Sequence, residues 1–254
     1  MNDTQKGEKA LLFLHGYLET MYIWEEFAVL LPDSFRCIFI DIPGHGLTGT
    51  HPESNTMDFC ARVCKEVLDK LELKSAVIVG HSMGGYIGQA CLKLYPERFS
   101  ALVHFNSTPY ADIPEKAGDR QKEIGFIENG KLISLASIAV CNMYSKDNVD
   151  RFKSKIEETV TLCETHDPSG IIACIRGLMD RPDNTAFLKS LKEKVMFVFG
   201  DQDKHCPLEK IAQIRKDVPS ARFEIVPGTG HNSFIEEPQK LAEALLDFVN
   251  TGNC

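Results

Sequence analysis

The amino-acid sequence predicts an α/β fold: a mostly parallel sheet of about six strands, with helices on both faces and a helical insertion. Three observations predict it. Short apolar, β-branched runs alternate with segments of helical periodicity over residues 10–105, and the alternation returns over residues 195–249. The runs are apolar almost throughout, as parallel strands are when helices cover both faces of their sheet. Residues 109–191, between the two regions, contain helix-like segments and no convincing strand.

Each predicted element follows from its local pattern. Residues 10–14 (ALLFL) and 36–41 (RCIFID) are predicted strands, separated by a short helix over 23–31. Phe59, Val63 and Val67 lie at helical spacing and predict a helix over 57–71. The remaining predicted elements are strands at 76–79, 101–105, 195–199 and 223–226, and helices at 83–95, from about 208, and at 238–249.

The elements form one folded core that is interrupted once. Residues 1–108 and 192–254 are predicted to form the α/β core, and residues 109–191 a helical segment inserted in it. A chain of 254 residues is long enough to bury a substantial core. Neither a low-complexity linker nor an internal repeat is visible in the sequence.

Composition and charge exclude several classes of partner. The 43% hydrophobic and 25% charged residues are ordinary for a soluble globular protein, and the formal net charge of −8 disfavours nucleic acid. The start MNDTQKGEK lacks the apolar region of a secretory signal, and no stretch has the roughly 18 apolar residues of a membrane span. We therefore expect a cytoplasmic protein that binds neither nucleic acid nor a membrane.

The nine cysteines are scattered along the chain without a C-x-x-C pair. Cys60 and Cys64 are one helical turn apart, but further metal ligands are missing from the nearby sequence. Reduced thiols that pack in the interior are the favoured interpretation. We expect no metal site and no cofactor.

The segment Gly80-His81-Ser82-Met83-Gly84 has the pattern G-x-S-x-G, directly after a predicted strand and before a predicted helix. Glycines on either side allow a tight turn that lifts the Ser82 hydroxyl to the carboxyl edge of the sheet. The helix N-terminus behind it favours developing negative charge. A glycine-rich packing turn is the alternative interpretation, but the strand and helix on either side favour a nucleophile.

A serine nucleophile needs a base and a group that orients the base. His231 follows the last predicted strand in a glycine-rich loop, at the edge where Ser82 is displayed. Asp201 and Asp203 follow the preceding predicted strand. We prefer Asp203 because the carboxylate needs loop length to reach the histidine. Asp201 is the alternative. Asn106 also follows a strand, but an amide carries no charge to stabilise an imidazolium. The other seven histidines are expected to be structural or solvated.

Acyl transfer also needs donors for the oxyanion. The backbone N–H of Met83, directly after the serine, is one candidate. The second is the backbone N–H of Tyr17, in the loop after the first core strand, which reads His15-Gly16-Tyr17. An ordinary strand-to-helix turn is the alternative interpretation of this loop.

Six stretches in this order resemble the α/β-hydrolase superfamily, in its small single-domain branch of carboxylesterases, lactonases and carbon–carbon bond hydrolases. They are LLFLHGY, DIPGHGLTGT, VGHSMGG, YPERFSALV, FGDQDKHCP and PGTGHNSFIEEP. The order Ser82, Asp203, His231 is the order of that superfamily's triad. The resemblance implies that residues 109–191 are a lid. Only residues 1–9 precede the His-Gly strand, where relatives often have an antiparallel hairpin, and we therefore expect six parallel strands.

The resemblance also limits the function. The enzyme of menaquinone synthesis that eliminates pyruvate has an arginine on the nucleophile helix, where this chain has Tyr86, which argues against that function. Haloalkane dehalogenases and epoxide hydrolases use aspartate where this chain has Ser82. The leading hypothesis is a serine hydrolase for a carboxylic ester or lactone, with Ser82, His231 and Asp203 as triad and no cofactor. Tyr86 and Tyr144 are predicted to line its pocket.

The substrate expected from sequence is a small molecule, an apolar or amphipathic ester. Apolar residues of the predicted lid favour such a substrate if their side chains face the pocket. Packing of these side chains among the lid helices is an equal alternative. The residues are Leu132, Ile133, Leu135, Ile138, Met143 and Tyr144. A second hypothesis is carbon–carbon bond hydrolysis or pyruvate elimination, with Arg176 or Arg181 binding a charged substrate. A third is a ligand receptor that keeps the fold without fast turnover.

Overall fold

The computed structural model describes residues 1–251, and one sheet of seven strands organises them. The spatial order is β1-β3-β2-β4-β5-β6-β7. The strands are β1 (Asn2–Asp3), β2 (Lys9–Leu14), β3 (Phe35–Ile40), β4 (Ala76–His81), β5 (Phe99–Phe105), β6 (Val195–Gly200) and β7 (Arg222–Val226). The last six are parallel to one another and match the six predicted strands.

The prediction of six strands missed β1. Asn2 and Asp3 pair antiparallel with Phe39 and Ile38 at the edge of the sheet. Two polar residues carry no strand periodicity, and the side chain of Asp3 is bound instead by Arg36, whose Nη2 lies 2.7 Å from Oδ2. The pairing is therefore a tertiary feature that local pattern does not reveal.

The helices alternate with the strands as predicted. They are η1 (Met21–Trp24), α1 (Glu25–Ala28), α2 (Met57–Lys70), α3 (Met83–Leu94), α4 (Pro114–Glu128), α5 (Leu132–Asn142), α6 (Lys153–Leu162), η2 (Cys163–Thr165), α7 (Pro168–Met179), α8 (Thr185–Ser190), η3 (Lys192–Lys194), α9 (Leu208–Asp217), α10 (Ser233–Glu236) and α11 (Pro238–Thr251). No strand occurs within residues 109–191, in agreement with the sequence prediction.

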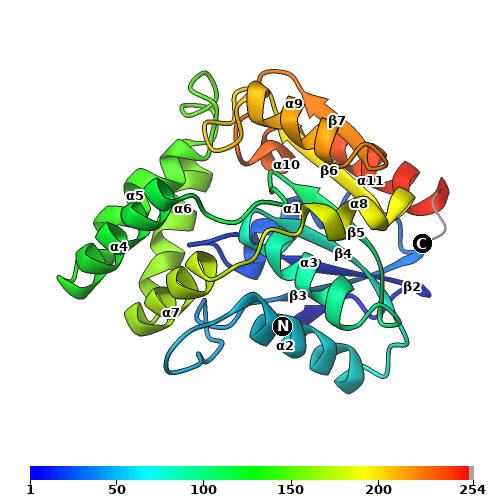
Figure 1. Cartoon of the computed structure of the whole chain (residues 1–254), viewed down its shortest axis with the longest axis horizontal. Coiled ribbons are helices and arrows are strands. Elements are labelled where there is room, and N and C mark those ends of the chain that lie inside the picture. Colours follow the sequence, from blue (N-terminus) through cyan, green and yellow to red (C-terminus); the bar gives the residue numbers. More distant parts are fainter. Residues whose placement is uncertain (252–254) are drawn as a thin grey trace.

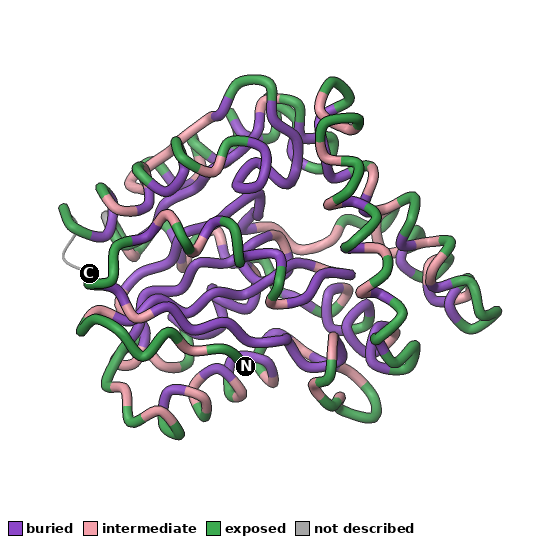
Figure 2. Tube along the Cα trace, turned by 180° about the vertical axis from the view of Figure 1, so that it is seen from behind, coloured by how far each residue is buried: buried purple, intermediate pink, exposed green. Residues whose placement is uncertain are grey.

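Two apolar layers hold the helices to the sheet. Phe13 and Val103 face a cluster that includes residues of α1 and α11, whereas their neighbours Leu12 and Leu102 face the cluster of α2 and α3. Successive strand residues point to opposite faces, and both faces are covered, so the inner strands are buried along most of their length (Figure 2). The edge strands β1 and β7 are only partly buried. Each fully buried Leu or Phe contributes about 1.5–3 kcal/mol relative to an exposed one.

The segment between β5 and β6 is all helical. α4, α5, α6 and α7 gather on one side of the molecule, away from α9 and α11 (Figure 1). α4, α5 and α7 share an apolar cluster that includes Ile124, Ala136 and Ile171, whereas Ile156 of α6 lies in the cluster of α1 and α11. α8 packs differently, because Leu188 lies in the cluster of β6 with Phe197. By its packing, α8 therefore belongs with the core, although it lies within residues 109–191.

Within residues 1–251, no helix combines the length and the apolar character needed to cross a bilayer. The same residues contain no group of three or more His, Cys, Asp or Glu side chains placed to hold a metal ion. Eight cysteines are free thiols, and all but Cys141 are buried. Cys254 lies outside the described residues.

Candidate active site

Ser82 occupies a strained turn between β4 and α3. Its φ of 48° and ψ of −109° lie outside the regions open to most residues with a side chain, and such conformations cost about 1–3 kcal/mol. The backbone N–H of Ser82 donates to the Phe105 carbonyl at 2.9 Å. A Cβ on Gly80 would lie 2.5 Å from the backbone of Gly84, and one on Gly84 would lie 2.2 Å from the Leu14 carbonyl oxygen. The glycines are therefore required by close backbone approach.

A cavity of about 460 Å³ opens above this turn. Ser82 and His231 both line it, although they are 149 residues apart in the sequence. Tyr17 and Met83 line it too, as does Tyr86. The sheet brings these residues together because the carboxyl ends of parallel strands meet at one edge.

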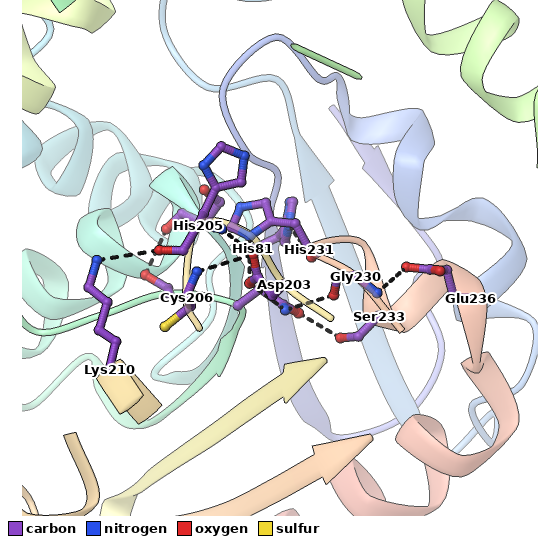
Figure 3. A network of polar contacts seen from close by, with 12 residues as sticks. His81, Asp203, His205, Cys206, Lys210, Gly230, His231, Ser233 and Glu236 are labelled. Carbon is purple, nitrogen blue, oxygen red and sulfur yellow. Dashed lines mark hydrogen bonds and ion pairs between the residues drawn. The ribbon is translucent and has the colours of Figure 1, made fainter. Parts of the chain in front are cut away.

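Asp203, and not Asp201, lies against His231. Nδ1 of His231 donates to Oδ2 of Asp203 at 2.8 Å (Figure 3). Burial alone raises the pKa of Asp203, but the neighbouring His231 charge and its hydrogen bond hold that pKa well below its ordinary value. An ionised Asp203 only accepts, so the proton of neutral His231 sits on Nδ1 and the lone pair on Nε2. Asp201 instead accepts from the N–H of Gly228.

Asp203 is held by further donors. Its Oδ1 accepts from the backbone N–H groups of His205, at 2.8 Å, and of Cys206, at 3.2 Å. Nδ2 of Asn106 donates to Oδ2 at 3.0 Å and also to the Gly230 carbonyl in the histidine loop. Asn106 carries no charge, as expected, but it hydrogen-bonds to Asp203, the acid that follows the neighbouring strand β6.

The support by Asn106 was not visible as a motif. The signal that could have found it is position: Asn106 follows β5 directly, and the end of β5 neighbours the end of β6. Its φ of 52° is left-handed, a conformation that Asn tolerates better than most residues. Ser233 fixes the amide orientation by donating to Oδ1 at 2.6 Å.

Among the described residues, no hydrogen bond joins the Ser82 hydroxyl to His231. The two side chains share the cavity, and catalytic hydrogen bonds commonly tighten only when substrate is present. The backbone N–H of Met83 opens α3, where a helix has no internal acceptor to offer. The backbone N–H of Tyr17 likewise has no acceptor within residues 1–251.

The loop that carries Tyr17 is held in place through the backbone N–H and carbonyl of the next residue, Leu18. Leu18 has a φ of 64°, unusual for a branched side chain, and is fully buried. Its N–H donates to Nε2 of His45 at 3.2 Å, and its carbonyl accepts from the thiol of Cys163 at 3.0 Å. His45 follows β3, and Cys163 follows α6, so distant segments together set the direction of the Tyr17 amide.

A buried chain of polar groups joins this loop to the serine turn and the histidine loop. Oε2 of Glu19 accepts from the N–H of Gly16 at 2.7 Å and faces Nδ1 of His81 at 2.7 Å. Nε2 of His81 donates to the carbonyl of His231 at 3.1 Å. Glu19 and His81 are both fully buried. No sequence signal marked Glu19. Gly16 is nearby in the sequence, but its other partner, His81, lies 62 residues away.

A sequence model described as the alpha/beta hydrolase fold matches residues 9–125. A thermophilic esterase from Thermogutta terrifontis, in a structure with malate bound, superposes with a TM-score of 0.91 at 24% identity, covering 98% of this chain and 92% of that chain. The match covers the strands, the serine turn and the insertion alike. The chain has the α/β-hydrolase fold.

Two curated relatives of this α/β-hydrolase match over nearly its whole length. A putative 2-succinyl-6-hydroxy-2,4-cyclohexadiene-1-carboxylate synthase of Bacillus subtilis is 26% identical, over 96% of this chain and 92% of the relative. A 2-hydroxy-6-oxononadienedioate/2-hydroxy-6-oxononatrienedioate hydrolase of Paraburkholderia phymatum is 25% identical, over 98% of this chain and 89% of the relative.

The prediction that Tyr144 lines the pocket of the hydrolase is wrong. Tyr144 is 1% exposed and packs in the core cluster beneath the sheet edge, with its ring stacked 5.6 Å from that of Phe152. The neighbouring Met143 lines the cavity instead. The other lid residues singled out from sequence do not line it: Leu132, for example, packs between lid helices, and Ile138 is exposed. Ala111, Ile113 and Leu178 of the same segment line the cavity instead.

Tyr86 lines the cavity of the hydrolase as predicted, but it is not alone there. The guanidinium carbon of Arg181 lies 4.2 Å from the centre of the Tyr86 ring, close enough for a cation–π contact. Arg181 follows α7, so this guanidinium approaches Tyr86 from outside the nucleophile helix. Arg176, the other candidate, donates to the Glu53 carbonyl on the outside and does not line this cavity.

Proposed function

We propose that this α/β-hydrolase cleaves a carboxylic ester or lactone through an acyl-enzyme on Ser82. The observation that carries the proposal is the Nδ1 hydrogen bond from His231 to Asp203, which leaves the Nε2 lone pair free. Ser82 shares the cavity with that histidine and stands in a strained turn at a helix N-terminus. Base, orienting acid and nucleophile are the parts that acyl transfer requires.

In the proposed reaction, Nε2 of His231 takes the Ser82 proton while Oγ attacks the carbonyl carbon. The N–H groups of Tyr17 and Met83 donate to the oxyanion. His231 then gives its proton to the leaving alcohol, and the acyl group stays on Ser82. A water molecule, losing its proton to His231, attacks the acyl carbon. His231 then returns the proton to the Ser82 oxygen as the bond to the acyl carbon breaks and the acid leaves. Asp203 remains ionised throughout and stabilises the imidazolium. The chemistry calls on neither metal nor cofactor.

We further propose that residues 109–191 act as the lid of this site. The insertion contributes Lys116, Arg120, Met143 and Arg181 to the cavity, whereas the core contributes Ser82 and His231. A small-molecule substrate would be enclosed between the two. Closure of such a segment excludes water from the acyl-enzyme until hydrolysis.

A second candidate keeps the same residues and changes the bond to carbon–carbon hydrolysis or elimination. Two observations favour it. The cavity carries several cationic side chains, and the two curated relatives are named for a carboxylate and a dioate.

Labelling with a fluorophosphonate probe tests the proposal. The wild-type protein should be modified at Ser82, and Ser82→Ala should not react. A panel of p-nitrophenyl esters and lactones should then show turnover that the same substitution abolishes. Labelling without turnover of any ester or lactone would favour the carbon–carbon reaction. Failure to label Ser82 would overturn a nucleophilic role and favour a ligand-binding protein.

A further inference from the structure

The cavity at Ser82 is cationic, although the chain as a whole is acidic. Its lining includes five lysines and arginines and two carboxyl groups, in a protein of formal net charge −8. They are Lys116, Arg120, Arg181, Lys204 and Lys210, with Asp112 and Glu123. A cleft of one sign with low-dielectric walls concentrates ligands of the opposite sign. Only the cations that no protein group already binds are available to a ligand.

Arg181 is occupied by the protein. Its Nε donates to the Tyr110 carbonyl at 3.1 Å and its Nη1 to the Leu178 carbonyl at 2.8 Å. Its Nη2 donates to Oδ1 of Asp112 at 2.6 Å. The arginine over Tyr86 is therefore a brace that fixes Asp112.

Arg120 is only partly occupied. Its Nε donates to Oδ2 of Asp112, and its two terminal nitrogens make no hydrogen bond within residues 1–251. The side chain is 10% exposed, so this donor pair is held in the cavity wall rather than in open solvent. The two ion pairs leave one net positive charge on Asp112, Arg120 and Arg181 together.

Lys116 stands one helical turn before Arg120, on the same face of α4. It is half-buried, it lines the cavity, and its ammonium has no hydrogen-bond or ion-pair partner among the described residues. Two like charges four residues apart repel each other. Both side chains line the same cavity, so an anion bound between them would offset this repulsion.

Two further polar atoms in the cavity wall lack partners within residues 1–251. They are the Tyr17 hydroxyl and Oε2 of Glu123, and both are buried. Burial raises the pKa of Tyr17 well above its ordinary value, so its hydroxyl stays a donor. Burial also raises the pKa of Glu123, against the effect of Arg120. Buried polar groups are normally paired, and unpaired ones in a cavity are matched by a ligand.

We propose that the substrate carries a carboxylate, which binds the terminal nitrogens of Arg120 and the ammonium of Lys116. This rests on the proposed function and makes the substrate an anionic ester or lactone, in place of the apolar one expected from sequence. Arginine pairs with a carboxylate through two parallel hydrogen bonds. A monoanion fits better than a phosphate dianion, since Asp112 and Glu123 stand in the same wall.

Matched esters test the proposal. One pair carries the charge on the acyl side, mono-p-nitrophenyl succinate against p-nitrophenyl butyrate. The other carries it on the leaving side, 4-acetoxybenzoate against phenyl acetate. We expect kcat/KM to favour the anionic member in at least one pair. Arg120→Met and Lys116→Met should each lower that preference roughly tenfold or more, because a charged hydrogen bond is lost.

Lys122→Met is the matched control, because Lys122 lies on the same helix but is exposed and pairs with Asp119 outside the cavity. It should keep the wild-type preference. If Arg120→Met folds poorly, Lys116→Met still tests the proposal, because removing the Lys116 ammonium leaves no protein group within residues 1–251 without its hydrogen-bond partner. Neutral esters preferred in both pairs, or a preference unchanged in both cavity variants, would overturn the carboxylate subsite.

Calorimetry separates this inference from the proposed function. Glutarate should bind the wild-type protein and Lys122→Met, and should bind Lys116→Met and Arg120→Met roughly tenfold more weakly or worse. If no ester is turned over but glutarate binds in this way, the subsite stands and the esterase proposal falls. If esters are turned over with neutral preference and glutarate does not bind, the esterase proposal stands and the subsite falls.

Discussion

Oε2 of Glu19 and Nδ1 of His81 lie 2.7 Å apart with neither side chain exposed to solvent. Burial raises the pKa of Glu19, but the His81 charge and the hydrogen bonds from His81 and Gly16 bring it below its ordinary value. An ionised Glu19 can only accept, and so can the His231 carbonyl at the other ring nitrogen. Both ring nitrogens of His81 therefore face acceptors, and Glu19 and His81 form a buried hydrogen-bonded pair.

Breaking this pair on one side should destabilise the protein strongly. In Glu19→Gln, we expect the free energy of unfolding to fall by about 3–5 kcal/mol, because the fully buried His81 ring loses its carboxylate partner. In Glu19→Gln/His81→Asn, the loss should be smaller than the sum of the single losses by more than about 1 kcal/mol. Urea unfolding of the four proteins in the cycle measures the coupling. Additive losses would show that Glu19 and His81 do not stabilise each other.

The two aspartates after β6 should differ sharply in their effect on catalysis. Asp203→Asn replaces an acceptor of the His231 Nδ1 proton by an amide that can donate, and the wrong tautomer should lower kcat about 10⁴-fold. Asp201→Asn should stay within about threefold, since Asp201 accepts only from Gly228 at a half-exposed turn. Initial rates on an ester that the wild type cleaves give both values. Equal losses in the two variants would contradict the assignment of the acid.

The glycines of the serine turn should not tolerate a methyl group. In Gly84→Ala the new Cβ would lie 2.2 Å from the Leu14 carbonyl oxygen, so we expect a loss of about 3 kcal/mol or more. Gly125→Ala is the control, because no atom lies within 4 Å of a Cβ there and the position is inside α4. It should stabilise by about 0.5–1 kcal/mol. Urea midpoints measure both, and a neutral Gly84→Ala would show that the turn is not tight.

Buried histidines should make stability fall below neutral pH. Burial lowers the pKa of His104 to about 3 and that of His166 to about 4, and it lowers those of His15 and His45 as well. The unfolded chain takes up these protons near pH 6.5, whereas the fold resists them. The stability they contribute is therefore present above about pH 6.5 and is lost as the pH falls toward their folded pKa values.

His104→Phe isolates one of these contributions. Both ring nitrogens of His104 are unpartnered within residues 1–251, and its ring stacks on Phe197 at 4.5 Å, so an aromatic ring without nitrogens suits the site. Between about pH 7.5 and pH 5, the variant should lose about 2 kcal/mol less of its unfolding free energy than the wild type. Urea unfolding across that range measures the difference. Parallel pH profiles would show that His104 is protonated in the fold without cost.

Residues close in sequence were readable without coordinates. The six long strands, the helices between them and the serine turn depend on periodicity and on glycine at short spacing, which are local properties. Asp203 and His231 were predictable because each follows a strand, and parallel strands end at one edge. The same reasoning missed β1, whose two polar residues have no pattern of their own.

Side-chain direction was not readable. Tyr144 and Met143 are adjacent and belong to the same core cluster, yet only Met143 also lines the cavity. Arg120 and Lys116 belong to a helix of weak amphipathic character, so its sequence does not say which face meets the cavity. Glu19 lies in an unremarkable loop, and its role depends on His81 and the His231 carbonyl arriving from other strands.

The sequence by itself thus determined the α/β architecture, the strained serine turn and the candidates Asp203 and His231, because strand periodicity and turn chemistry are encoded over a few residues. Only the tertiary structure decided what surrounds them: the Asn106 support, the Glu19–His81 pair and a cationic cavity in an acidic chain. Those features depend on rotamers and on contacts between segments 60 or more residues apart, which no local pattern specifies.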